Sequence, residues 1–276
     1  MMQTYDSRKK EQKGIDISSH NGEVDMEKVK KSGIEFVIIR LGYGKNQNQI
    51  DKRFMENYNN AIKVNIPVGI YLYSYALGCA DAKKEAELVI NFIKNFKIEY
   101  PIFLDMEDTD NYKSKRNVGN DTLVDICETF CNAIEDAGYY AGIYANLDWF
   151  NNKLNDERLD RFDKWVAHWS DNCNYEKDFG MWQFTAKGTV DGVKGNVDLN
   201  YAFKDYKNII RNARLNNLNI MKNEHIVKEG ENLSTIAKKY NVSWENIYED
   251  NKQIIGDNPN LILSGQKLTI YREGCE

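Results

Sequence analysis

The sequence contains few of the residues from which metal and thiol sites are built. Its three histidines, His20, His168 and His225, are scattered, and neither an H-E-x-x-H nor a C-x-x-C motif is present. A zinc site made of protein ligands is therefore not expected, and no cofactor is predicted. The five cysteines are an odd set, in which Cys127 and Cys131 lie four residues apart as neighbours on one face of a predicted helix. This set favours a reducing, cytosolic origin.

Long apolar runs are absent from the sequence too. No stretch approaches the roughly 20 apolar residues that a helix needs to cross a bilayer. Residues 1–13 are polar and charged, without the apolar segment of a secretory signal, and we expect them to form a disordered leader. The formal net charge of −5 argues against nucleic acid as a partner. We therefore expect a protein made in the cytoplasm without a signal peptide and with no membrane partner.

One acidic stretch, YPIFLDMED at residues 100–108, organises the rest of the chain. Its apolar run, bounded by Pro101, predicts a buried strand that ends in two carboxylates, Asp105 and Glu107. Because side chains alternate along a strand, both acids should face the same way as Phe103. Neighbouring carboxylates among apolar groups repel each other and lose solvation, which raises the pKa of one and leaves the other ionised. Such a pair suits acid–base catalysis, although acids at a strand end can also face solvent or cap a loop.

Strands and helices alternate over the first 150 residues. Continuous apolar strands are predicted at 14–18, 35–41, 68–75, 100–108 and 140–145, with helices at 24–32, 51–64, 81–95 and 121–137. This order predicts right-handed crossovers and a parallel sheet or barrel. Beyond residue 150 only short strands follow, at 165–169, 180–184 and 197–200. The pattern therefore indicates an α/β fold, an incomplete β/α barrel that three bare closing strands complete.

In such barrels functional groups lie at the C-terminal ends of the strands. Two further acids, Asp16 and Asp198, fall at or near these ends. Four polar or aromatic residues share this position and are candidates for a substrate groove: Tyr73, Tyr144, Trp169 and Gln183. Structural alternatives exist for all of them, because Asp16 could cap a turn, Asp198 could be an ordinary loop acid, and the aromatic residues could belong to the core.

The last fifty residues have the pattern of a small unit of their own. Residues 207–223 are polar and rich in Asn and Lys, and they are predicted to form a linker. A strand at 224–228, helices at 232–240 and 243–251, and a strand at 268–271 then predict an α+β strand–helix–helix–strand domain over residues 224–271. Ser243 is the predicted N-cap of its second helix. Trp244, Ile247 and Tyr248 are expected to face inward.

The barrel segment resembles a known family. GIDIS at 14–18, FLDME at 103–107, WQ at 182–183 and VDLN at 197–200 are similar to motifs of glycoside hydrolase family 25, the lysozymes of the Chalaropsis type. The resemblance covers residues 14–206 and implies five strand–helix units and three closing strands. It also implies cleavage of the β-1,4 bond between N-acetylmuramic acid and N-acetylglucosamine. Glu107 matches the proton donor and Asp105 its partner, while Asp16 and Asp198 match two further active-site acids.

The tail resembles a LysM module. Its opening, VKEGENLSTIAKKYNVS at 227–243, and its close, NPNLILSGQKL at 258–268, carry the resemblance. Modules of this type bind glycans that contain N-acetylglucosamine, such as peptidoglycan. The resemblance implies a shallow groove between two loops, with Gly230, Asn232, Asn260 and Ile262 as glycan-binding residues.

Together these features predict a peptidoglycan hydrolase, an N-acetylmuramidase with a C-terminal module that targets the bacterial cell wall. Its expected partners are peptidoglycan and other N-acetylglucosamine-containing glycans. The alternative is a non-catalytic peptidoglycan-binding protein, although a pure binder has no need to crowd four carboxylates together. An amidase or endopeptidase would need a zinc or thiol site that the His and Cys residues do not offer. Without a signal peptide, the enzyme is expected to reach the wall after release through membrane holes or lysis.

Overall fold

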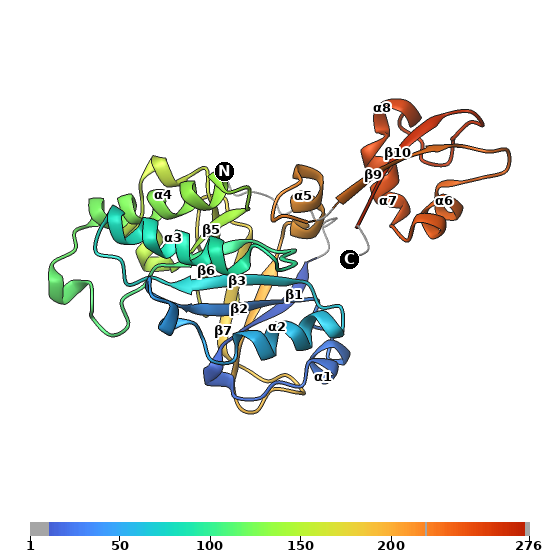
Figure 1. The fold of residues 1–276 in the computed structure, drawn as a ribbon. Helices are drawn as coiled ribbons and strands as arrows, with labels where there is room; N and C mark the ends of the chain where they lie inside the picture. Colours follow the sequence, from blue (N-terminus) through green and yellow to red (C-terminus); the bar gives the residue numbers. More distant parts are fainter. Residues whose placement is uncertain (1–10, 219, 274–276) are drawn as a thin grey trace.

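Apolar runs in the first two hundred residues form eight strands that close into a barrel (Figure 1). The computed structural model describes residues 11–218 and 220–273. The barrel strands are β1 (Gln12–Ile17), β2 (Phe36–Tyr43), β3 (Val68–Tyr73), β4 (Ile102–Asp105), β5 (Ala141–Asn146), β6 (Asp163–Ala167), β7 (Met181–Gly188) and β8 (Val197–Ala202). Their order around the barrel follows the chain, so that β8 lies next to β1.

The direction of β8 differs from that of the other barrel strands. β1 to β7 run parallel to one another, whereas β8 pairs antiparallel with both β7 and β1. The ladder with β8 also makes β1 start earlier than the sequence predicts, because Gln12 and Lys13 pair with it. These two residues therefore belong to the barrel and not to the predicted leader. Residues 1–10 of that leader lie outside the described residues.

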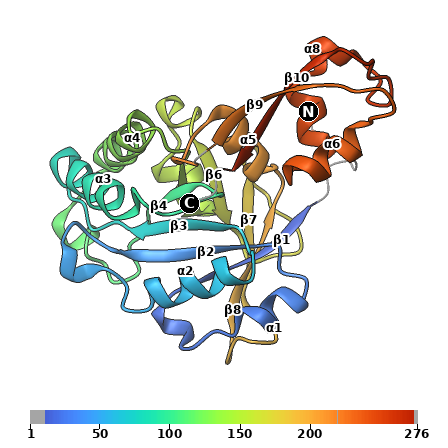
Figure 2. The ribbon, with the colours of Figure 1, turned by 45° about the vertical axis from the view of Figure 1, so that its right-hand side comes forward.

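Helices cover the outside of the barrel along its first four crossovers (Figures 1 and 2). They are α1 (Met26–Lys31), α2 (Phe54–Lys63), α3 (Cys79–Ile93) and α4 (Asn120–Asp136), and 3₁₀ turns η1 (Ser19–Asn21), η2 (Gln47–Gln49) and η3 (Ser114–Arg116) accompany them. The fifth unit is completed by a short π-helix, η4 (Trp149–Lys153), and a 3₁₀ turn, η5 (Glu157–Leu159). Within the described part of the chain, no helix combines the length and the apolar content needed to span a membrane.

Strand alternation divides the apolar side chains between two clusters. Ile102 and Leu104 of β4 pack outward in the large cluster under the helices. Phe103, between them, belongs to the second cluster inside the barrel, where its ring centroid lies 5.2 Å from that of Trp165. This is the alternation that the sequence predicts, and it directs the groups that follow Phe103 on the same face toward the barrel mouth.

A helix closes the opposite end of the barrel. In α5 (Tyr206–Ala213), Tyr206 and Ile210 are buried in the interior cluster. Asn216 follows with no exposed surface, and its side chain bonds to two carbonyl groups before β4 and to the N–H of Tyr140. Residues 206–218 thus pack as part of the barrel, which differs from the linker predicted over 207–223. Only a few apolar residues on the inner face of α5 pack into the barrel. Its outer face is polar, and this polarity predicts a linker from the sequence.

The tail forms a second unit. Strands β9 (Ile220–Ile226) and β10 (Lys267–Glu273) pair antiparallel, and between them lie α6 (Leu233–Tyr240), α7 (Trp244–Asp250) and the short α8 (Lys252–Ile255). Ser243 caps α7 by accepting a hydrogen bond from the N–H of Asn246, as the sequence predicts. Ile247 is buried, whereas the prediction that Trp244 faces inward is wrong, since 38% of it is exposed. The buried members of the small core are all aliphatic, and Tyr240 and Tyr248 pack against it from its edge.

The two units touch beside α5 (Figures 1 and 2). Nη1 of Arg211 lies 3.2 Å from Oδ2 of Asp250 in α7, with only about a tenth of either side chain exposed. Nη2 of Arg214 donates a hydrogen bond of 2.7 Å to the hydroxyl of Tyr271 in β10. The tail therefore rests on the helix that closes the barrel, on the side away from the strand ends that carry the acids.

Candidate active site

Four acidic residues come together at the mouth where the parallel strands end. Asp16 lies near the end of β1, Asp105 is the last residue of β4, and Glu107 follows two residues later. Asp198 is the second residue of β8, not near its C-terminal end as the sequence predicts, because this antiparallel strand begins where the others finish. Asp16 and Asp198 are direct partners across the β1–β8 ladder. The barrel thus brings all four predicted acids to one end.

Asp16 is held by two amide side chains. It is 5% exposed, and its Oδ2 accepts hydrogen bonds from Nδ2 of Asn200 at 2.8 Å and from Nε2 of Gln183 at 3.0 Å. Burial raises the pKa of Asp16 well above its usual value, and the charge of Asp198 raises it further, against the effect of the two amides. Burial also raises the pKa of Asp198, whose carboxyl is hydrogen-bonded to that of Asp16. The two carboxyls are therefore expected to share a proton.

Asp105 and Glu107 form a second carboxyl pair. Asp105 is 4% exposed, and its Oδ1 is buried without a hydrogen-bond partner among the described residues. Burial raises the pKa of both acids, and the charge of Glu107 adds to the rise at Asp105. The two carboxyls are hydrogen-bonded to each other. This pair is therefore expected to keep a proton to a higher pH than an isolated carboxyl would, and Glu107 is the member that an entering molecule can reach.

A buried lysine that sequence reasoning missed lies behind this second pair. Lys113 is 2% exposed, and its Nζ donates hydrogen bonds to the backbone carbonyls of Ser74 and of Glu107, the latter at 2.9 Å. Its charge opposes the rise in the pKa of Asp105 and Glu107, while burial lowers its own pKa. Lys113 thus fixes the backbone after β4. No signal marks it in the sequence, where it stands in a polar, lysine-rich loop.

One glutamine connects the acids to the opposite wall of the mouth. Oε1 of Gln183 accepts hydrogen bonds of 3.1 Å from the hydroxyl of Tyr144 and from Nε1 of Trp169, while its Nε2 donates to Asp16. Trp169 is 65% exposed and presents its indole to solvent. Burial raises the pKa of Tyr144 well above its usual value, and the charge of Asp105 adds to this effect. These three predicted groove residues therefore lie together beside the acids.

Tyr73 and Asn200 complete the mouth. Tyr73 is the partner of Asp105 across β3 and β4, and its hydroxyl lies 3.1 Å from Oγ1 of Thr109. Burial raises the pKa of Tyr73 to about 12. Asn200 was not among the predicted site residues, yet it bonds both Asp16 and the indole nitrogen of Trp165. Its spacing of two from Asp198 on β8 was the signal that could have identified it.

The four residues predicted to bind glycans in the tail lie in two loops. Gly230 has a positive φ of 81°, and Asn232 caps α6 by accepting a hydrogen bond from the N–H of Thr235. In the second loop Asn260 is exposed, whereas Ile262 is half-buried and packs against the small core. The side chains that this second loop exposes most are Leu261 and Leu263, at 61% and 65%.

The arrangement at the barrel mouth suits proton transfer and charge stabilisation. Carboxyl groups with raised pKa values can donate protons near neutral pH, and their ionised partners can stabilise a developing cation. Within residues 11–218 and 220–273, no group of three or more His, Cys, Asp or Glu side chains has the arrangement of a metal site.

Comparison with known proteins relates this barrel to lysozymes. Over 188 residues the chain is 27% identical to the autolytic lysozyme of Clostridium acetobutylicum, covering 68% of this chain and 54% of that protein. It is also 27% identical over 202 residues to lysozyme M1 of Streptomyces globisporus, covering 68% of this chain and 66% of that protein. The chain thus spans between a half and two thirds of the length of these relatives.

Two solved structures share the fold. The autolysin LytC from Streptococcus pneumoniae superposes with a TM-score of 0.63 at 30% identity, over 69% of this chain and 46% of that one. The catalytic domain of endolysin ply40, from bacteriophage P40 of Listeria monocytogenes, does so with a TM-score of 0.60 at 25% identity, over 73% and 97%. The predicted α/β barrel with a small α+β tail is confirmed.

Family matches divide the chain as its two units do. Residues 225–270 match the LysM domain, which confirms the second resemblance. Residues 15–193 match the glycosyl hydrolases family 25, a span that includes Asp16, Asp105 and Glu107 and ends before β8. Asp198 joins the other acids through the β1–β8 ladder. Because the match covers well over half of the sequence, the chain belongs to family 25 of the glycosyl hydrolases.

Proposed function

We propose that this protein is a peptidoglycan hydrolase, an N-acetylmuramidase that cleaves the β-1,4 bond between N-acetylmuramic acid and N-acetylglucosamine in the cell wall. The observation that carries the proposal is the meeting of two carboxyl pairs, each with one buried member, at the mouth of a family 25 barrel. The names of two relatives, autolytic lysozyme and lysozyme M1, support the same activity. Peptidoglycan as the partner is supported by the LysM module and by LytC, which was solved in complex with a synthetic peptidoglycan ligand.

Glycoside cleavage needs an acid at the leaving oxygen and stabilisation of an oxocarbenium-like centre. Glu107 gives its proton to the glycosidic oxygen, because its pKa is raised and it is the accessible member of its pair. As the C1–O bond breaks, the carbonyl oxygen of the substrate's 2-acetamido group bonds to C1. Asp105 accepts the acetamido N–H and stabilises the positive charge that develops there. Glu107, now a carboxylate, then removes a proton from the water that opens this intermediate.

The remaining site residues position the sugar. Asp16 and Asp198 keep the mouth electronegative next to the cationic centre, and Gln183 fixes Asp16 on one side. The exposed indole of Trp169 offers a face on which a pyranose ring can stack. Tyr73 and Tyr144 border the same opening. In the tail, the loops with Gly230, Asn232, Asn260 and Ile262 hold N-acetylglucosamine units of the wall.

Digestion of purified Gram-positive cell walls tests the proposal. Mass spectrometry should find fragments that end in reducing N-acetylmuramic acid, with no increase in free amino groups. Glu107→Gln should lower the rate by roughly 100-fold or more while the fold and wall binding persist. New amino groups would instead identify an amidase or endopeptidase, and wall binding without any cleavage would identify a pure binding protein.

A further inference from the structure

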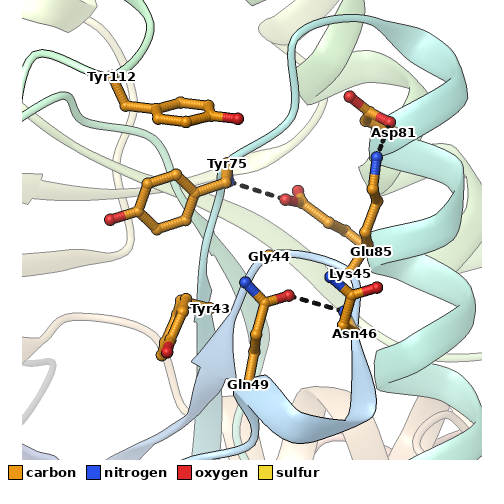
Figure 3. Close-up of a pocket in the computed structure, with 9 residues that line it drawn as sticks. All are labelled: Tyr43, Gly44, Lys45, Asn46, Gln49, Tyr75, Asp81, Glu85 and Tyr112. Atoms are coloured by element: carbon orange, nitrogen blue, oxygen red, sulfur yellow. Dashed lines mark hydrogen bonds and ion pairs between the residues drawn. The ribbon is translucent and has the colours of Figure 1, made fainter.

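A cavity of about 250 Å³ lies beside the acidic mouth and is not used by the proposed mechanism (Figure 3). The loop after β2, the segment after β3, the start of α3 and the loop after β4 surround it. Its principal side chains are Tyr43, Lys45, Tyr75, Asp81, Glu85 and Tyr112. Tyr75 connects it to the mouth, because its ring centroid lies 5.1 Å from that of Tyr73. The cavity is therefore a side pocket that branches from the row of acids.

Three tyrosine rings form the apolar side of this pocket. Tyr75 is the central ring, with Tyr43 edge-on at 5.8 Å and Tyr112 edge-on at 4.9 Å between ring centroids. The hydroxyl of Tyr75 donates a 2.7 Å hydrogen bond to Asp110, which fixes the ring. Tyr43 is 43% exposed, so a bound group can reach its ring from solvent. Where these rings line the cavity, they offer an apolar surface against which a short aliphatic chain can pack.

Opposite the rings stands an ion pair between Lys45 and Asp81 (Figure 3). Of the Lys45 side chain 38% remains exposed, and of the Asp81 side chain 25%. A left-handed turn at Gly44, with φ of 63°, directs the chain of Lys45 toward α3. Because an exposed ion pair contributes little stability, a ligand with charges of both signs can insert between its partners at small cost.

Glu85 forms the floor beneath this ion pair. It is 1% exposed, and its carboxyl accepts hydrogen bonds of 2.8 Å from the N–H of Tyr75 and from the hydroxyl of Ser74. Its oxygens are therefore occupied by the protein and hold the Tyr75 backbone in place. The pocket thus has one cation near its rim, one accessible carboxylate in Asp81, and an apolar wall that is rigidly supported.

The N-acetylated sugars of peptidoglycan offer no ammonium group to such a pair, whereas its peptide stems carry both ammonium and carboxylate groups. We propose that the tyrosine pocket binds a dipolar amino-acid residue of the peptide stem, with its carboxylate at Lys45, its ammonium at Asp81 and its methylene groups against Tyr75. The identity of this ligand rests on the proposed function. A stem branches sideways from the glycan strand, which matches a pocket that branches sideways from the catalytic row.

A charge swap tests this assignment. Lys45→Asp combined with Asp81→Lys keeps an ion pair but reverses its polarity, and Arg53→Glu combined with Glu56→Arg does the same at an exposed pair on α2 as a matched control. The full-length protein should bind a synthetic stem tetrapeptide whose diamino-acid side chain carries both a free ammonium and a free carboxylate group. The pocket swap should weaken this binding about tenfold or more, and the control swap should leave it unchanged. Circular dichroism should show both swaps folded.

Hydrolysis separates this proposal from the proposed function. Wild-type protein should cleave stem-bearing glycan strands with higher kcat/KM than strands whose stems an amidase has removed, and the pocket swap should abolish the difference. Peptide binding that disappears in the pocket swap supports the pocket even if neither glycan is cleaved, which would contradict only the hydrolase. No peptide binding, or equal binding by both swaps, overturns the pocket assignment. The assignment is also overturned if the pocket binds stem-free glycan and if Tyr43→Ala, but not the pocket swap, abolishes that binding.

Discussion

At the scale of single residues, Asp105 combines deep burial with a carboxyl neighbour. Its folded-state pKa is raised by burial and by Glu107, so the folded protein holds its proton at pH values where the unfolded chain has lost it. Stability is therefore fully present below the ordinary carboxyl pKa and falls as the pH rises toward the raised value. Ionisation of Asp105, which the proposed mechanism uses, therefore costs stability, as is common at active sites.

Asp105→Asn should accordingly raise the melting temperature at pH 7 while lowering activity severely. We expect about 2–4 °C for each kcal/mol of repulsion and desolvation that is relieved. The gain should vanish below about pH 3.5, where the wild-type carboxyl is protonated in both states. Thermal denaturation followed by circular dichroism from pH 3 to pH 8 measures it.

Asp108→Asn serves as a control for which the expected change in melting temperature has the opposite sign. Although burial opposes the change, hydrogen bonds from Ser114 and Lys113 lower the pKa of Asp108. Its contribution to stability is present above the ordinary carboxyl pKa and is lost as the pH falls, so this variant should melt at a lower temperature at pH 7. Equal shifts in Asp105→Asn at all pH values would contradict the electrostatic account.

Sequence reasoning reached the acids of this site but not their supports. Asp105 and Glu107 could be placed on one face because strand alternation is a local property. Asn200 obeys the same rule relative to Asp198, but its role depends on Asp16, which lies 184 residues away along the chain. Lys113 donates hydrogen bonds to backbone carbonyls and not to a side chain of opposite charge, so no pattern of residue types indicates it. Supports of this kind follow only from the closed barrel.

At the scale of elements, the segment after α5 shows how a polar sequence can be structural. Asn216 makes hydrogen bonds of 3.0 and 3.1 Å to the carbonyls of Ile98 and Tyr100, and it accepts one of 2.7 Å from the N–H of Tyr140. These bonds satisfy buried backbone groups in the loops before β4 and β5. The polarity that predicts a linker is therefore used to close the barrel.

Asn216→Ala should leave these buried groups without partners and destabilise the barrel by roughly 3 kcal/mol or more. The exposed Asn212→Ala on α5 serves as the matched control and should change stability by less than about 0.5 kcal/mol. Urea denaturation monitored by tryptophan fluorescence compares the two. Similar midpoints for both variants would show that residues after α5 are only a connection.

In the tail loops, sequence alone does not distinguish residues of the glycan groove from residues of the small core. Ile262 was predicted in the groove, and the structure packs it against the small core while Leu261 beside it is 61% exposed. Leu261→Asp should therefore abolish binding of N-acetylglucosamine oligomers without unfolding the module, whereas Ile262→Asp should unfold it. Glycan titration beside circular dichroism separates these results. An unfolded Leu261→Asp protein, or one that binds normally, would remove this loop from the groove.

At the scale of the whole molecule, the question is how far the barrel depends on the tail. Every proposed catalytic acid lies in the barrel. Among the described residues, the contacts between the units at α5 include the ion pair of Arg211 with Asp250 and the hydrogen bond of Arg214 with Tyr271. Arg211 lies in α5 and Arg214 is its C-cap, and this helix belongs to the barrel through Tyr206 and Ile210. The functional boundary is therefore expected after residue 218 and not within α5.

A chain that ends at residue 218 should fold and cleave soluble muropeptide glycans at the full-length rate, because α5 and Asn216 remain in place. A chain that ends at residue 205 loses both and should unfold, since the side chains of Tyr206 and Ile210 no longer fill the barrel end. On intact walls the 218-residue protein should bind and lyse more weakly, because the tail no longer raises the local concentration of the barrel at the polymer. Sedimentation with purified walls measures binding, and release of reducing ends from soluble glycan measures catalysis. If the 218-residue protein loses activity on soluble glycan while remaining folded, the tail contributes to the catalytic site itself, and the separation of roles between the two units is wrong.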